Sequence, residues 1–137
     1  GFPSIPIRIF RPDLKFVLVE SNKKKSLFLN EVKNELNFDN LTVINCKIEN
    51  FSVPEKPFDY VISRGFGSLQ KFSQLAKPLL SKDGHMYTFK TKQFTSELDF
   101  ITSNKEKDGI KISEIAEYDL GNQILGLNLV SLELIKD

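Results

Sequence analysis

The sequence lacks the residues and segments that several classes of protein require. It has one cysteine, Cys46, in 137 residues, which excludes a disulfide framework and a cysteine-rich zinc site. No apolar run approaches the roughly 20 residues that span a bilayer, and no signal-like apolar segment follows Gly1. These absences predict a cytoplasmic protein that neither enters a membrane nor depends on a metal.

An excess of charge of one sign is also missing. Nineteen basic and 18 acidic residues leave a net charge of +1, so an RNA site would have to be a local patch. The single histidine, His85, has no visible partner, and no nucleophile–base pair is apparent, which argues against a hydrolase. Hydrophobic residues at 40% and charged residues at 27% match a globular chain. We therefore expect one domain over residues 1–137.

Short apolar runs alternate with stretches of helical spacing. Runs such as Phe16–Val19 are typical of strands buried on both faces of a parallel sheet. The expected strands are Phe16–Val19, Leu41–Ile44, Tyr60–Ile62 and Met86–Phe89. Strand–helix–strand repeats favour parallel pairing, with helices on both faces of a sheet. The first four strands should therefore share one sheet.

Three stretches have the spacing of helices. Residues 22–36 carry Phe28, Val32 and Leu36 four residues apart, with Leu29 beside them, which predicts an amphipathic helix. Apolar residues between Leu69 and Leu79 predict a second helix, closed by a turn at 81–84. A weaker pattern covers residues 95–104.

The end of the chain has a different pattern. Isoleucines at 110, 112 and 115, and the alternation over 127–133, predict two strands joined through 119–122. Adjacent strands of this kind favour an antiparallel pair. The fold class predicted is α/β, mainly parallel, with an antiparallel C-terminal pair.

Ligands on such sheets bind beyond the carboxyl ends of the strands. Glu20 ends the first strand, where a carboxylate could accept hydrogen bonds from a ribose or could favour the start of the next helix. Ile48 and Glu49 follow the second strand. They could sandwich an adenine and bind its polar edge, or belong to an ordinary surface loop.

Arg64 directly follows the third strand. Its guanidinium could grip a carboxylate or phosphate, or form a surface ion pair with Asp59 or Glu49. Gly65 and Gly67 suggest a close backbone approach or a tight turn into the helix.

Lysines gather near the same strand ends. Lys23, Lys24 and Lys25 start a helix, and Lys90 and Lys92 follow the fourth strand. They could contact phosphates, whereas a lysine run alone is usually a solvated helix face.

Taken together, several segments resemble the RsmG (GidB) family, bacterial methyltransferases of small-subunit ribosomal RNA. The segment Phe58–Leu69, with sequence FDYVISRGFGSL, is the most specific match. The other matching segments are Gly1–Ile7 with Arg11–Asp13, Leu18–Lys25 with Phe28–Leu29, Lys47–Glu49, and Lys82–Gly84 with Phe89–Lys90.

The resemblance implies a Rossmann-like class I methyltransferase that uses S-adenosyl-L-methionine to methylate N7 of a guanine in 16S ribosomal RNA. Its partner would be that RNA or the small ribosomal subunit, and a monomer is favoured. The cofactor-site residues implied are Gly1, Phe2, Glu20, Ile48, Glu49 and Arg64. The RNA-side residues implied are Lys23, Lys24, Lys25 and Lys90. No catalytic residue is assigned, because guanine N7 carries no proton for a base to remove.

The sequence also departs from the family. Glu20 replaces an aspartate, Lys47 an arginine and Thr91 a glycine. The family's N-terminal helices and central first strand would precede Gly1, so we expect an N-terminally truncated chain. The alternatives are an inactive fragment or RNA-binding remnant of such an enzyme, and another Rossmann-like methyltransferase.

Overall fold

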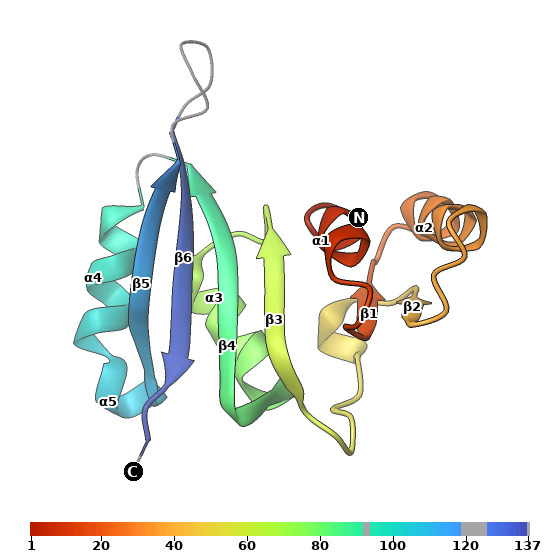
Figure 1. Ribbon diagram of the computed structural model, residues 1–137. Coiled ribbons are helices and arrows are strands. Elements are labelled where there is room, and N and C mark those ends of the chain that lie inside the picture. The colour runs from red at the N-terminus through yellow and green to blue at the C-terminus, as the bar shows by residue number, and fades with distance from the viewer. Residues whose placement is uncertain (92–93, 119–125, 137) are drawn as a thin grey trace. The chain divides into compact units, whose positions relative to one another are not determined.

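The computed structural model describes residues 1–91, 94–118 and 126–136 (Figure 1). The chain divides into two compact units, Gly1–Ser52 and Val53–Asp137. Lys92 and the connection at 119–122 lie outside the described residues. Among the helices of the described ranges, none is long and apolar enough to cross a membrane.

The first unit is built on a parallel strand–helix–strand motif. Strands β1 and β2 pair in parallel, with Phe16 opposite Leu41 and Val19 opposite Ile44, as the sequence predicted. Its elements are α1 (Ser4–Phe10), β1 (Phe16–Val19), α2 (Lys23–Glu35), β2 (Leu41–Ile44) and the 3₁₀ helix η1 (Ile48–Asn50). A small core of Leu18, Leu29, Phe38 and Leu41 lies between helix and strands.

The predicted helix is confirmed as α2, and of the four apolar residues that indicated it, Leu29 is the one that is fully buried. The buried residues of α2 are Ser26 and Leu29, whereas Phe28 is 61% and Leu36 48% exposed. Positions 26 and 29 lie on one side of a helix, and Phe28 is turned about 100° away from Leu29. The apolar spacing of Phe28, Val32 and Leu36 therefore identified the helix but not its packed face.

The second unit is a four-stranded sheet in the order β3-β4-β6-β5. Its elements are β3 (Phe58–Arg64), α3 (Leu69–Ala76), the 3₁₀ helix η2 (Lys77–Leu79), β4 (Leu80–Thr91), α4 (Thr95–Ser103), α5 (Lys105–Asp108), β5 (Ile110–Tyr118) and β6 (Leu127–Leu134). Strand β3 is parallel to β4, and β6 runs antiparallel to both β4 and β5. The predicted antiparallel C-terminal pair is confirmed.

The prediction that the first four strands share one sheet is wrong for the described residues. They lie in two sheets, β1-β2 and β3-β4-β6-β5. Within the described ranges, no strand pairs with β1 on the edge away from β2, or with β3 on the edge away from β4. Joining β1 to β3 in one sheet needs either direct pairing between them or a strand that bonds to both, and neither is present there.

The core of the second unit lies between its sheet and the helices α3 and α4, which cover one face (Figure 1). Leu69, Met86, Val130 and Leu132 are at most 2% exposed. Side chains alternate across a strand, so Met86 and Thr88 point into this core from β4. The sheet face and the two helices thus hold the carboxyl end of β3 in place.

Strand β4 begins earlier than predicted. It starts at Leu80, so residues 81–84 lie within the strand and do not form a separate turn. The register shifts from Phe58 opposite Leu80 to Tyr60 opposite His85, so the extra residues form an irregularity in the ladder. A Cβ atom at Gly84 would lie 3.0 Å from the Phe58 carbonyl oxygen, which explains the glycine there.

An ion pair links the neighbouring strands β5 and β6 of the same sheet. Lys111 Nζ on β5 lies 2.8 Å from Glu133 Oε1 on β6, and this hydrogen bond is the main cause of a lowered pKa of Glu133. A carboxyl group whose folded-state pKa is depressed stabilises the fold above its unfolded pKa and loses that effect as the pH falls through the folded value.

We therefore expect Lys111→Met to lower the free energy of unfolding by about 0.5 kcal/mol at pH 7, and by less at pH 3. At pH 3, which is below the usual Glu133 pKa of 4.5, protonation weakens the pair in the unaltered protein. Urea unfolding of both proteins at both pH values measures the difference. An equal loss at the two pH values would contradict the assignment.

Candidate functional site

Glu20 stands at the carboxyl end of β1, and its carboxylate is engaged locally. Glu20 Oε1 accepts a hydrogen bond from the Asn22 backbone N–H at 2.8 Å. Asn22 in turn caps α2, because its side-chain oxygen accepts from the Lys25 N–H at 3.1 Å. These contacts match the helix-start interpretation of Glu20, and its ribose role stays a prediction.

Asn45 is a residue that the sequence analysis missed. It directly follows β2, and its Nδ2 donates to the Glu20 carbonyl oxygen at 2.7 Å and to the Ser21 carbonyl oxygen at 3.3 Å. The side chain therefore ties the exit of β2 to the exit of β1. Its strand-end position was the available signal, but the analysis singled out Lys47–Glu49 instead.

Three of the predicted residues come together in the first unit. The Gly1 backbone nitrogen lies near enough to Glu20 and Lys25 to feel the charge of both side chains. Gly1 also lies against α2, since a Cβ atom there would lie 2.7 Å from Leu29 Cδ2. Gly1, Glu20 and Lys25 thus share one end of this unit.

The other predicted residues of the first unit lie nearer its surface. Phe2 is 58% exposed, and Glu49 is exposed beside the half-buried Ile48 in η1. Lys23, Lys24 and Lys25 form the exposed first turn of α2. Positive charge is disfavoured at a helix N-terminus, so this run does not contribute to the stability of the helix through its charge.

Arg64 is the exposed last residue of β3, opposite Phe89 of β4. The turn that follows uses glycines with φ of +67° at Gly65 and +102° at Gly67. Apart from the adjacent residues, no atom of the part of the chain that the structure describes lies within 4 Å of where a Cβ would stand at either position. Of the two interpretations of these glycines, the structure supports a tight turn and not a close backbone approach.

Lys90 is held inside the second unit. Its Nζ donates to the Gly67 carbonyl oxygen at 2.5 Å and lies 2.9 Å from Glu97 Oε1 and 2.7 Å from Oε2. Glu97 Oε2 also accepts the Leu69 N–H at 2.6 Å, at the start of α3. The analysis missed Glu97, since it lies on α4 and no periodic pattern links it to Lys90.

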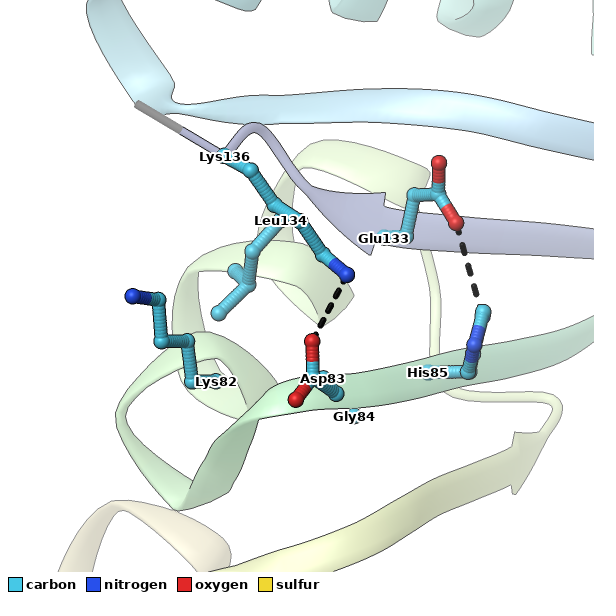
Figure 2. Close-up of a pocket in the computed structure, with 7 residues that line it drawn as sticks. All are labelled: Lys82, Asp83, Gly84, His85, Glu133, Leu134 and Lys136. Atoms are coloured by element: carbon cyan, nitrogen blue, oxygen red, sulfur yellow. Dashed lines mark ion pairs between the residues drawn. The ribbon is translucent and has the colours of Figure 1, made fainter.

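A pocket lies at the other end of β4 and is lined by its residues 82–85 together with Glu133, Leu134 and Lys136 (Figure 2). Its charged groups pair with one another. Lys136 Nζ is 2.6 Å from Asp83 Oδ1, a hydrogen bond that lowers the pKa of Asp83 and raises that of Lys136. His85 Nδ1 lies 3.7 Å from Glu133 Oε2. The amino ends of parallel strands are not where such sheets bind ligands, so we do not assign the site here.

Comparison with known proteins gives the family. The family described as rRNA small subunit methyltransferase G matches residues 1–125. A relative from Legionella pneumophila (strain Corby), named ribosomal RNA small subunit methyltransferase G, is 48% identical over 61% of this chain and 40% of its own. One of the same name from Ectopseudomonas mendocina is 37% identical over 84% of this chain and 53% of its own. The chain therefore spans about half the length of these curated relatives.

Solved structures give the fold. M. jannaschii TYW2 in complex with AdoMet superposes with a TM-score of 0.73 at 17% identity, over 98% of this chain and 65% of its own. A putative RNA methyltransferase from Pyrococcus horikoshii superposes with a TM-score of 0.65 at 16% identity, over 89% and 64%. These likenesses confirm the predicted Rossmann-like methyltransferase fold. The match over residues 1–125 places the chain in the rRNA small subunit methyltransferase G family, the one that the sequence motifs resemble.

Proposed function

We propose that the protein acts in S-adenosyl-L-methionine-dependent methylation of guanine N7 in 16S ribosomal RNA, in the cytoplasm. The observation that carries the proposal is the family match over residues 1–125. The segment with the most specific motif supports it, because Phe58–Leu69 forms a strand, a glycine turn and a capped helix start at the carboxyl end of a parallel pair. Such strand ends are the ligand-binding edge of this class of sheet.

The reaction depends mainly on holding the cofactor and the guanine in the right relative position. When bound, S-adenosyl-L-methionine supplies a methyl group that the N7 lone pair attacks, while the carbon–sulfur bond breaks and its electrons stay on sulfur. No proton leaves N7, so the protein needs no general base. Holding the two reactants in line can contribute several kcal/mol to the lowering of the barrier, and the protein residues proposed below bind and orient.

Glu20 fits the cofactor's ribose. Its Oε1 is fixed by the Asn22 N–H, which orients the carboxylate at the end of β1, and a carboxylate can accept from more than one donor. In the same unit, we assign Phe2 and Ile48 to apolar contacts with the adenine, Glu49 to its polar edge, and Gly1 to the backbone near the cofactor. Arg64, in the second unit, is proposed to bind a carboxylate or phosphate through its guanidinium.

The three lysines at the start of α2 are proposed to contact RNA phosphates. They are exposed and consecutive, and their charge does not favour the helix end that carries them. The net charge of +1 means that attraction to RNA has to come from local groups of this kind.

A substitution at Glu20 tests the cofactor assignment in the complete gene product. Glu20→Gln keeps an oxygen for the Asn22 N–H but removes the charge, so affinity for S-adenosyl-L-methionine should fall by about 1–3 kcal/mol. Isothermal titration calorimetry measures the change, with Glu31→Gln on the exposed side of α2 as the matched control. Unchanged affinity in Glu20→Gln would assign this carboxylate to the helix start alone.

The RNA assignment has a separate test. Replacing Lys23, Lys24 and Lys25 by glutamine should leave cofactor binding intact and flatten the dependence of RNA affinity on salt, because each lost phosphate contact removes up to about one unit of the log–log slope. Lys56, Lys105 and Lys107 are exposed elsewhere, and their triple replacement controls for net charge. An equal effect of both triple variants would show that the α2 run is an ordinary solvated face.

Arg64→Ala should change a different measured quantity from the triple lysine variant. It should impair cofactor use or methyl incorporation into small-subunit RNA, while leaving the salt slope of RNA binding unchanged. The two readouts are methyl incorporation and RNA affinity across a salt series. A flattened slope in Arg64→Ala would move this residue to the RNA side. RNA binding without any methyl incorporation by the unaltered protein would favour the second candidate, an RNA-binding protein without turnover.

A further inference from the structure

The turn at residues 65–68, which links β3 to α3, needs contacts beyond those of its own side chains. Two of its residues are glycines with positive φ, and glycine restricts the backbone least of all residues. Phe66 packs edge-on against Phe72 in the core, with 5.9 Å between ring centroids, and Ser68 caps α3 by accepting the Lys71 N–H at 3.2 Å. The Gly67 carbonyl oxygen and the Leu69 N–H are bonded from elsewhere in the second unit.

Lys90 and Glu97 supply those contacts. Lys90 Nζ has three donor hydrogens, and its acceptors are the Gly67 carbonyl oxygen and both carboxylate oxygens of Glu97. Glu97 Oε2 also accepts the Leu69 N–H, the first amide of α3. One ion pair thus holds a carbonyl within the turn and the amide directly after it.

Burial makes this pair stiff. The Lys90 side chain is 12% exposed and that of Glu97 27%, so water competes weakly for either charge. The pair also joins three elements, because Lys90 lies on β4, Glu97 on α4 and Leu69 on α3. An exposed pair between two mobile side chains would not fix a backbone in this way.

We propose that Lys90 and Glu97 are positioning residues that hold the β3–α3 turn, and with it Arg64, in the geometry required for methyl transfer. The proposal rests on the proposed function of this strand end. It replaces the RNA-side role expected for Lys90, because this side chain is 12% exposed and its ammonium is already bound to the Gly67 carbonyl oxygen and to the Glu97 carboxylate.

The test compares Lys90→Met and Glu97→Gln in the complete gene product. Each removes one charge of the pair, and the amide oxygen introduced by Glu97→Gln can still accept the Leu69 N–H. Both should lower the turnover of methyl transfer to small-subunit RNA, by up to about 100-fold, since a displacement on the order of 1 Å costs that much. The salt slope of RNA binding should stay the same in both variants.

A phosphate contact by Lys90 predicts a different pattern. Lys90→Met would then flatten the salt slope by about one unit, and Glu97→Gln would raise RNA affinity by releasing the lysine. Opposite effects of the two substitutions on RNA binding, with turnover at saturating RNA unchanged, would overturn the positioning role.

The matched control is Lys77→Met. Lys77 Nζ donates to the Asp108 carbonyl oxygen, so this variant also removes a lysine-to-carbonyl contact from the second unit. Lys77 lies in η2, before β4 begins. Its turnover should equal that of the unaltered protein. The double variant Lys90→Met/Glu97→Gln should turn over no more slowly than the worse single variant, because the two residues act as one unit.

A readout that needs no activity separates this inference from the proposed function. Amide hydrogen exchange at Leu69 should be faster in Lys90→Met and in Glu97→Ala than in Lys77→Met, at a temperature where all variants remain folded. If the unaltered protein does not methylate ribosomal RNA, the proposed function fails while the exchange result still decides the role of the pair. Unchanged exchange at Leu69 in both variants would contradict it.

Discussion

Parallel pairing of consecutive strands is the constraint on which the rest of this structure depends. β1 with β2, and β3 with β4, each place two carboxyl ends at one edge. Because a parallel pair needs a crossover between its strands, α2 starts at the carboxyl edge of the pair in the first unit, and α3 starts at the carboxyl edge of the pair in the second unit. Strand exits and helix starts therefore meet, and the polar groups left unpaired at both are available for side-chain contacts or for a ligand.

The two units satisfy these strand-end groups in related ways. In the first, Asn45 bonds the carbonyls that follow β1, while Glu20 accepts an amide N–H in the turn to α2. In the second, Lys90 bonds a carbonyl in the turn after β3, while Glu97 accepts the first amide of α3. Each turn is thus held by one donor and one carboxylate from side chains. These side-chain contacts restrict the backbone of each turn.

The spacing of apolar residues predicted where helices and strands lie better than it predicted what they pack against. The strands at 16–19 and 41–44 agree with the structure residue for residue, because short apolar runs report local preference for a buried strand. The spacing of apolar residues identified α2 but did not separate the buried Leu29 from its exposed neighbour Phe28, because that difference depends on which side of the helix meets the strands. The start of β4 was also missed, because polar residues at 81–84 have the composition of a turn.

The candidate site could be predicted only where position along a strand was enough. Glu20 and Arg64 were found in this way, at the ends of β1 and β3. Glu97 could not be found, because its partners Lys90 and Leu69 come from two other places in the chain. Contacts between segments leave no periodic signal, so residues that hold a turn from another segment are harder to predict from one sequence than residues at the ends of strands.

At the start of α2, interactions with the helix dipole separate residues that stabilise the helix from residues that do not. Three lysines at a helix N-terminus oppose the helix dipole, at up to roughly 0.3–1 kcal/mol each when exposed. The Asn22 cap offsets about 1 kcal/mol of this, and the Glu20 carboxylate adds negative charge where the dipole favours it. Asn22 and Glu20 therefore contribute to the stability of the helix start, whereas the charges of the lysines do not. The three lysine charges are thus left without a folding role, and the RNA contact proposed for them stays a prediction.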